Sequence, residues 1–196
     1  MATTQINPTR MELTRLKKKL GTAVKGHRLL KDKRDELMRE FLDLVKVNME
    51  LREKVEKGIK NANNNFVLAK AGMSDEELRS ALMAPKQEIS LVTDKKNVMS
   101  VDIPVYDFKT KSADSNDIYS YGFAFTSGDL DYAVDSLQEV FRDMLKLAEV
   151  ENGIYRLAVA IKKTQKRANA LKNILIPKFI GISKYISDSL EEKEKN

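Results

Sequence analysis

The chain has 196 residues, 35 basic and 29 acidic side chains, a formal net charge of +6, one histidine and no cysteine. Without cysteine there can be no disulfide scaffold, thiolate zinc site or cysteine nucleophile, and one histidine cannot build a multi-histidine metal site. No uncharged apolar run approaches the ~20 residues that a membrane span needs, so we expect a soluble, cytoplasmic protein with no cofactor.

The charge is distributed unevenly along the chain. Residues 1–60 carry 16 basic and 9 acidic groups, residues 61–130 carry 7 and 10, and residues 131–196 carry 12 and 10. The three segments therefore have net charges of +7, −3 and +2. High overall charge (33%) with few aromatic residues (7%) favours long helices around a narrow core, flanking a centre of different character.

A long helix is predicted from the start of the chain. Either Asn7 followed by Pro8, or a capping box of Thr9 and Glu12, can begin it. Beyond this start, apolar residues recur at alternating intervals of three and four, which is the spacing of a coiled-coil seam. The predicted seam residues of this helix are Leu13, Leu16, Leu20, Leu30, Leu37, Phe41, Leu44 and Leu51.

The middle of the chain begins with a second helix signal. Ser74 and Glu77 form a capping box, and the short helix that it opens must end before Pro85. β-Branched residues then gather over residues 89–105, with residues 94–97 as a plausible hairpin turn. A further candidate strand is marked by alternating aromatic residues, among them Tyr119, Tyr121 and Phe123.

A second long helix is predicted after residues 126–129, which offer a helix start. Its first apolar stripe comprises Val134, Leu137, Phe141, Met144 and Ala148. After a small phase shift, the predicted seam continues through Ile154, Leu157, Ile161, Ala168, Leu171 and Leu175. Pro177 should then kink or interrupt the helix.

Two helices of matched length joined by a compact insertion pair most simply in antiparallel orientation, with both termini at one end. We therefore predict a mainly α fold: a long antiparallel two-helix coiled coil with a small central α/β insertion of a β-hairpin and a short helix. The expected domains are residues 1–72, the insertion over residues 73–126, and residues 127–196. A parallel homodimer of each helix is a less favoured alternative.

No arrangement of residues supports an enzyme. The glycine-rich segment of residues 21–28 has His27 and Arg28 where a phosphate loop needs lysine and serine or threonine. The basic first helix leaves open a coiled-coil scaffold or a nucleic-acid tether, although acidic residues interleave with its cations and no aromatic residues lie among them to stack on bases.

Both ends of the chain carry motifs that resemble one family. The first helix starts Asn7-Pro-Thr-Arg10 and runs on through Gly26-His-Arg-Leu29, and the last helix contains Lys166-Arg-Ala-Asn-Ala-Leu171 followed by Ile176-Pro177. Over nearly its whole length the chain resembles the D subunits of the V-type (A/V-type) rotary ATPases. Ala168 and Lys172 stand where this family usually has valine and glutamate.

The resemblance implies the central rotor shaft of such a complex, which couples rotation mechanically and does not hydrolyse ATP itself. The implied partners are the catalytic and non-catalytic ring subunits (A and B), the small F subunit of the rotor and a cup-shaped subunit that couples to the membrane ring, with no nucleic acid. The implied location is the cytoplasmic side of the cell membrane, as a peripheral part of the complex. Whether the pump moves protons or sodium stays open.

On this interpretation, particular residues are expected at the interfaces. For the catalytic ring we choose basic residues of the two terminal helical segments, namely Arg10, Arg15, Lys19, Lys31, Arg34, Lys166, Arg167, Lys172 and Lys178. For the rotor partners we choose Tyr119, Tyr121 and Phe123 at the flank of the insertion.

Overall fold

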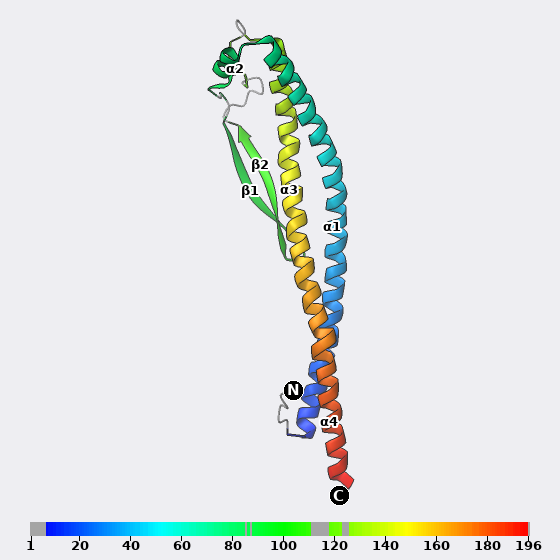
Figure 1. The fold of residues 1–196 in the computed structure, drawn as a ribbon. Helices are drawn as coiled ribbons and strands as arrows, with labels where there is room; N and C mark the ends of the chain where they lie inside the picture. The colour runs from blue at the N-terminus through cyan, green and yellow to red at the C-terminus, as the bar shows by residue number, and fades with distance from the viewer. Residues whose placement is uncertain (1–6, 85, 87, 111–117, 123–125, 196) are drawn as a thin grey trace. The chain divides into compact units, whose positions relative to one another are not determined.

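The structure is a computed structural model that describes residues 7–84, 86, 88–110, 118–122 and 126–195. The prediction of a mainly helical fold, with long helices from both ends of the chain packed together and a central hairpin and short helix, is confirmed (Figure 1). In chain order the elements are α1 (Arg10–Gly72), α2 (Asp75–Leu82), β1 (Ile89–Val98), β2 (Val101–Thr110), α3 (Gly128–Ala170), the π-helical turn η2 (Leu171–Leu175) and α4 (Ile176–Lys195).

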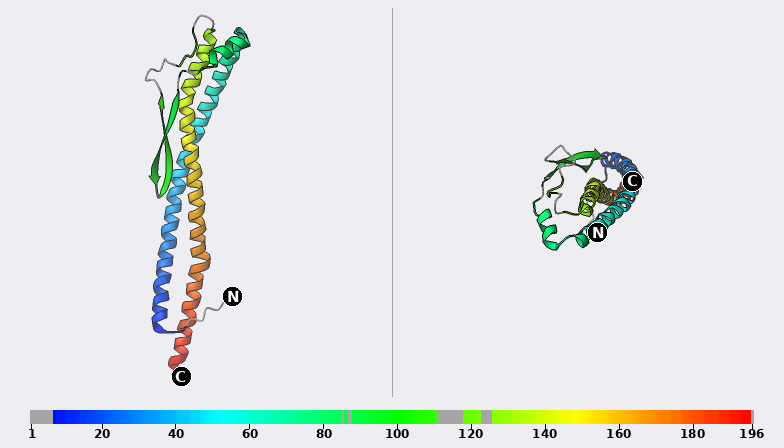
Figure 2. Two further views of the ribbon diagram at one scale, coloured as in Figure 1. Left: turned by 90° about the vertical axis from the view of Figure 1, so that its left-hand side faces the viewer. Right: turned by 90° about the horizontal axis from the view of Figure 1, so that it is seen from above.

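The chain forms two compact units, each of which pairs part of α1 with part of the C-terminal helices. The terminal unit comprises residues 1–40 and 158–196, and the central unit comprises residues 41–157. Figure 2 shows the same elements from two further directions.

Thr9 caps the N-terminus of α1. Its hydroxyl oxygen accepts a hydrogen bond from the amide of Glu12 at 3.3 Å, and its carbonyl oxygen accepts one from the amide of Leu13 at 3.0 Å. Of the two starts that the sequence allows, the helix therefore uses the threonine, because its hydroxyl satisfies one of the amides that the first helical turn leaves without a partner.

In the terminal unit the two helices are antiparallel. Arg10 forms an ion pair with Glu194, and Arg34 Nη1 donates to Gln165 Oε1 at 2.8 Å, so residue numbers rise along α1 while they fall along its partner. Leu37 and Ile186 are completely buried (0% exposed). Within this unit the start of α1 lies beside the end of α4, so the prediction that both termini lie at one end of the helix pair is confirmed.

The central unit repeats the antiparallel arrangement. Arg52 pairs with Glu151 at 2.5 Å and Lys54 pairs with Asp143 at 2.8 Å across the two helices. The apolar seam of this unit consists of small and medium-sized side chains. Its buried members are Val55 and Ala62 from α1, and Ala133, Val140, Val150 and Leu157 from α3.

The predicted apolar stripe at the start of α3 is wrong in its phase. The buried residues Ala133 and Val140 are seven apart, as are Val150 and Leu157, whereas Leu137 and Met144 are 53% and 38% exposed. No phase shift is needed along this helix. The sequence pattern misled because α3 has a second apolar face, which packs on the hairpin.

That second face contacts β2. The ring of Phe108 packs edge-on against Phe141 with ring centroids 6.2 Å apart, and the guanidinium of Arg142 lies 5.7 Å from the centre of the Phe108 ring. The amide of Tyr106 donates to Glu149 Oε2 at 2.9 Å. The hairpin therefore packs on α3 through β2, which lies between β1 and α3 in Figure 1.

The hairpin turn lies at Met99 and Ser100, so the predicted turn at residues 94–97 is wrong. Both turn residues have positive φ angles, 50° and 67°, as a two-residue type I′ turn requires. The side chain of Asn97 supports this turn, because its Oδ1 accepts from the amide of Ser100 at 3.1 Å and its Nδ2 donates to Asp102 Oδ1 at 2.7 Å. Residues 94–97 instead continue β1.

The predicted capping box of α2 is confirmed. The amide of Ser74 donates to Glu77 Oε2 at 2.9 Å, and the amide of Glu77 donates back to Ser74 Oγ at 3.3 Å. The hydrogen bond from the Ser74 backbone, followed by that from its hydroxyl, lowers the pKa of the Glu77 carboxyl. The capped helix places Leu78 and Ala81 in a small core with Ala69 and Leu130.

The interruption expected near Pro177 takes the form of the π turn η2, which directly precedes α4. The amide of Ile176 donates to the carbonyl of Leu171, five residues earlier. Proline lacks an amide hydrogen, and its ring collides with the carbonyl four residues back in a regular α-helix. A wider turn before Pro177 removes that conflict while the chain stays helical.

Two glycines of α1 test how closely the helices approach. A Cβ atom added to Gly58 would lie 2.1 Å from Val140 Cγ2, whereas one added to Gly21 would meet nothing within 4 Å. We expect Gly58→Ala to lower the free energy of unfolding by about 1–3 kcal/mol through overpacking. Gly21→Ala should raise it by about 0.5–1 kcal/mol through helix propensity. Urea unfolding followed by circular dichroism measures both; equal effects would contradict the close contact.

Candidate functional site

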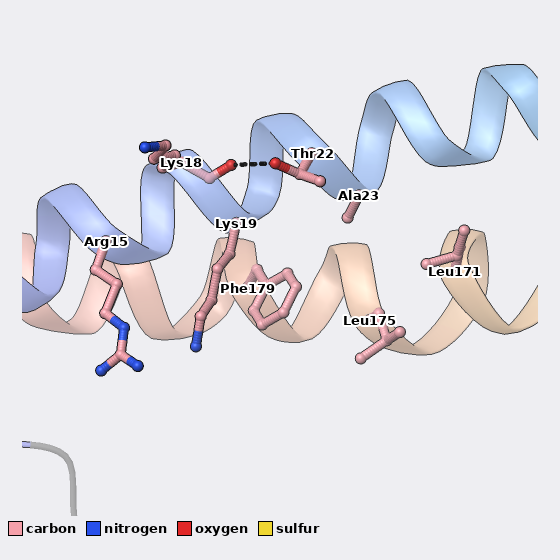
Figure 3. A pocket seen from close by; sticks show the side chains of 8 residues that line it. All are labelled: Arg15, Lys18, Lys19, Thr22, Ala23, Leu171, Leu175 and Phe179. Atoms are coloured by element: carbon pink, nitrogen blue, oxygen red, sulfur yellow. Dashed lines mark hydrogen bonds between the residues drawn. The ribbon is translucent and has the colours of Figure 1, made fainter.

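An open groove of about 440 Å³ lies between α1 and the C-terminal helical segment of the terminal unit (Figure 3). Its apolar side comes from residues spaced four apart, which share one face of the C-terminal helix. Its polar rim comes from α1. The lining residues are Arg15, Lys18, Lys19, Thr22 and Ala23 from α1, with Leu171, Leu175 and Phe179 from η2 and α4.

The groove combines an apolar floor with cations. Leu175 was a predicted seam residue, and it is 38% exposed because it lines this groove. Arg15 Nη1 donates to Glu12 Oε1 at 3.1 Å, while Lys18 and Lys19 are exposed and have no ion-pair partner among the described residues. Such a surface suits an acidic partner segment that also carries an apolar side chain.

The other basic residues chosen for a ring interface fall into two groups. Arg10 and Arg34 are held within the chain, the first by Glu194 and the second by Gln165 and by Asp35 at 2.6 Å. The second group is exposed and, across the described residues, forms no hydrogen bond or ion pair. Its members are Lys31, Lys166, Arg167, Lys172 and Lys178.

The remaining predicted seam residues lie inside the helix pairs to different degrees. Buried are Leu16, Leu37, Leu157 and Ala168. Half-buried are Leu13, Leu20, Leu30, Phe41, Leu44, Leu51, Ile154, Ile161 and Leu171. A two-helix seam leaves its flanks open to water, which is why most of these side chains keep some exposure.

The two described aromatic residues of the predicted rotor-partner site are bonded to α3 of their own chain. The hydroxyl of Tyr119 donates to Asp135 Oδ1 at 2.7 Å, and that of Tyr121 donates to Asp131 Oδ1 at 2.8 Å. Their rings meet edge to face, with centroids 5.9 Å apart. Residues 118–122 form no strand, contrary to the sequence prediction, and Phe123 lies outside the described residues.

These bonds change the acidity of both hydroxyls. The hydrogen bond to Asp135, followed by burial and by the charges of Asp135 and Asp131, raises the pKa of Tyr119 to about 12. Burial, followed by the hydrogen bond to Asp131, raises the pKa of Tyr121 well above its usual range. Tyr121 also packs against the small core beneath α2.

A second apolar groove, of about 240 Å³, lies in the central unit between α1, α2 and α3. Phe66, Leu82 and Leu137 line it and are each more than one-third exposed. Sequence reasoning missed this groove because it placed Leu137 in the helix seam and gave Phe66 and Leu82 no role. Leu137 lies four residues after the buried Ala133 and three before the buried Val140, so its spacing could not mark it as a groove residue.

Neither a metal centre nor a membrane span is found in the described parts of the chain. No three acidic or histidine side chains gather there in a way that could hold a metal ion. Within the same residues, every helix is too short or too polar to cross a bilayer.

Comparison with known proteins gives a consistent result. A model of the ATP synthase D-subunit family matches residues 12–196. The chain is 53% identical to the V-type ATP synthase D subunit of Clostridioides difficile over 195 residues, covering 100% of this chain and 87% of the relative. The same protein of Acetivibrio thermocellus is 54% identical over 195 residues (100% and 88%), and that of Clostridium novyi 52% over 196 residues (100% and 91%).

The tyrosine bonds give a pH prediction. Because the pKa of Tyr119 is raised from its ordinary value of 10.0, the stability that its hydrogen bond contributes is fully present below pH 10 and is lost as the pH rises through about 12. We expect Tyr119→Phe to remove a tyrosinate absorbance step near pH 12, and Asp135→Asn to move this step to lower pH. A step that stays in place in Asp135→Asn would contradict the assigned bond.

Proposed function

The chain belongs to the family of V-type ATP synthase D subunits and is a non-catalytic component of the central stalk, and we propose that it transmits torque between the catalytic ring and the ion-translocating membrane sector. The observation that supports this proposal is the antiparallel pairing of the helices in both units. Family membership also decides against the nucleic-acid tether and the free-standing scaffold that the sequence left open.

Pairing supports this function because torque reaches a second element only if two helices turn together. In the terminal unit, bonds from Arg10 to Glu194 and from Arg34 to Gln165 cross between the helices. In the central unit, the ion pairs of Arg52 and Lys54 do the same. Each exposed ion pair contributes only ~0–1 kcal/mol, so the buried seam supplies most of the resistance to sliding.

The outer surface supports rotation within a protein sleeve. Exposed lysines and arginines keep their water and form weak, interchangeable contacts, since exposed ion pairs contribute little individually. A large apolar patch would instead hold the rotor at one angle. We therefore propose that the free cations Lys19, Lys31 and Lys166 face the ring of A and B subunits, together with the other chosen ring-interface residues.

The remaining assignments follow from the same proposal. Residues 1–72 and 127–196 would supply the shaft, and residues 73–126 the insertion. The flank of that insertion, including Tyr119 and Tyr121, would face the small F subunit of the rotor and the cup-shaped membrane-coupling subunit. The protein would then lie at the cell membrane as a peripheral part of the complex.

A charge-reversal pair tests the ring interface. Lys19→Glu with Lys31→Glu changes two exposed lysines that lack partners among the described residues. In the reconstituted complex, we expect coupled ATPase activity to fall by roughly two- to tenfold, the effect of two weak surface charges of up to ~1 kcal/mol each. Ion transport measured per ATP hydrolysed reports coupling directly.

The control is Lys25→Glu, which reverses the charge of an exposed lysine on the same helix. Lys25 is six residues from both Lys19 and Lys31, so its side chain points about 120° away from each of them around the helix axis. We expect the control to retain activity within about twofold. Equal losses in both variants would show a general charge effect and would contradict the proposed interface.

A further inference from the structure

The two outer edges of the hairpin differ in their hydrogen bonding. With a two-residue turn and the observed register, alternate residues of each strand direct their backbone groups toward the partner strand and the others direct them outward. In β2 the outward residues are Asp102, Pro104, Tyr106, Phe108 and Thr110; in β1 they are Ile89, Leu91, Thr93, Lys95 and Asn97.

The outer edge of β2 is closed to another strand. The amide of Tyr106 donates to Glu149 of α3, and the amide of Phe108 donates to the Asp107 side chain, both at 2.9 Å. Pro104 has no amide hydrogen to offer. The carbonyl of Asp102 accepts from Arg156 Nη1 at 3.0 Å. This edge is thus protected by side chains from α3 and by a proline, a usual device against edge-to-edge pairing.

The outer edge of β1 is open over its first half. The outward amides of Ile89, Leu91 and Thr93 have no hydrogen-bond partner among the described residues, whereas that of Lys95 is bonded by the Asp94 side chain at 2.7 Å. All residues of β1 except Val98 are exposed. Backbone donors and acceptors therefore face water at regular spacing along this edge.

The side chains of the open edge are apolar and uncovered. Ile89 is 45% exposed and Leu91 is 51% exposed on one face of the strand, and Val92 is 40% exposed on the other. Charge protects only the part near the turn, where Lys95 and Lys96 follow. An exposed apolar edge of this kind is a template for strand addition.

We propose that the outer edge of β1 from Ile89 to Thr93 binds an extended segment of a neighbouring subunit of the complex as a third strand. That segment would carry apolar side chains at alternate positions, to cover Ile89 and Leu91. It would carry a carboxylate at the end that reaches Lys95, which lies on the same face of the strand as Ile89 and Leu91 and has no anionic partner among the described residues.

Charge also favours a different protein over a second copy of this chain. Two β1 edges pair antiparallel only with outward residues opposite outward residues, so a pairing centred on Thr93 would place Lys95 of each copy opposite Leu91 of the other. Ammonium groups would then lose water against apolar side chains without gaining a carboxylate. A heterologous segment with an acidic end satisfies both halves of the strand.

Two substitutions of Thr93 test whether the β1 edge binds a strand. Thr93→Pro removes an outward amide and leaves the hairpin ladder intact, as Pro104 does on β2, while Thr93→Val keeps the amide and a similar side-chain volume. The binding partner in the assay is the reconstituted V-type complex that lacks this chain. We expect Thr93→Pro to weaken binding about fivefold, and Thr93→Val to stay within about twofold.

Hydrogen exchange in the wild-type chain tests the proposal without any substitution. On assembly, the amides of Leu91 and Thr93 should exchange at least about tenfold more slowly, while the inward amides of Val92 and Asp94 are protected already in the free chain. Unchanged exchange at Leu91 and Thr93, or equal binding by both Thr93 variants, would overturn the proposal. So would concentration-dependent dimers of the free chain with the same protection. These readouts measure binding, so they are independent of whether torque coupling succeeds.

Discussion

The narrow apolar seam between two antiparallel helices is the constraint on which the rest of this structure depends. A helix as long as α1 cannot bury its apolar face by itself. It therefore packs against helices from the other end of the chain. Leu37, Leu157 and Ile186 reach complete burial in these pairs, and Gly58 allows Val140 to approach the backbone of α1. Because only a stripe is buried, most of each helix remains available for charge.

The middle of α3 serves two neighbours at once. A Cβ atom on Gly153 would lie 3.1 Å from Ile103 on the hairpin and 3.4 Å from Leu44 on α1, so this position allows three layers to meet. The hairpin is held through β2 by aromatic packing and by polar contacts to α3. As a consequence, β2 is sealed by the same contacts that attach it, and β1 is left as the exposed strand.

The charged side chains form two groups: those that bond the two paired helices to each other, and those that face outward. Arg10 and Arg34 are bonded to the opposite helix, so their role is at least partly structural. Lys18 and Lys19 instead rim an apolar groove that faces outward. A rotor that turns inside a complex needs both kinds: cross-links between its own helices, and weak, hydrated contacts with its surroundings.

The sequence by itself determined the helix pair, the caps at Thr9 and Ser74, the central hairpin and the family, because spacing and capping are local and repeat along the chain. It did not determine the turn at Met99 and Ser100 or the second apolar face of α3. Nor did it place Leu175 in a groove or join Tyr119 to Asp135. Each of these depends on which neighbour an apolar or polar side chain meets, and only tertiary packing decides that: Phe141 looks the same in sequence whether it faces α1 or Phe108.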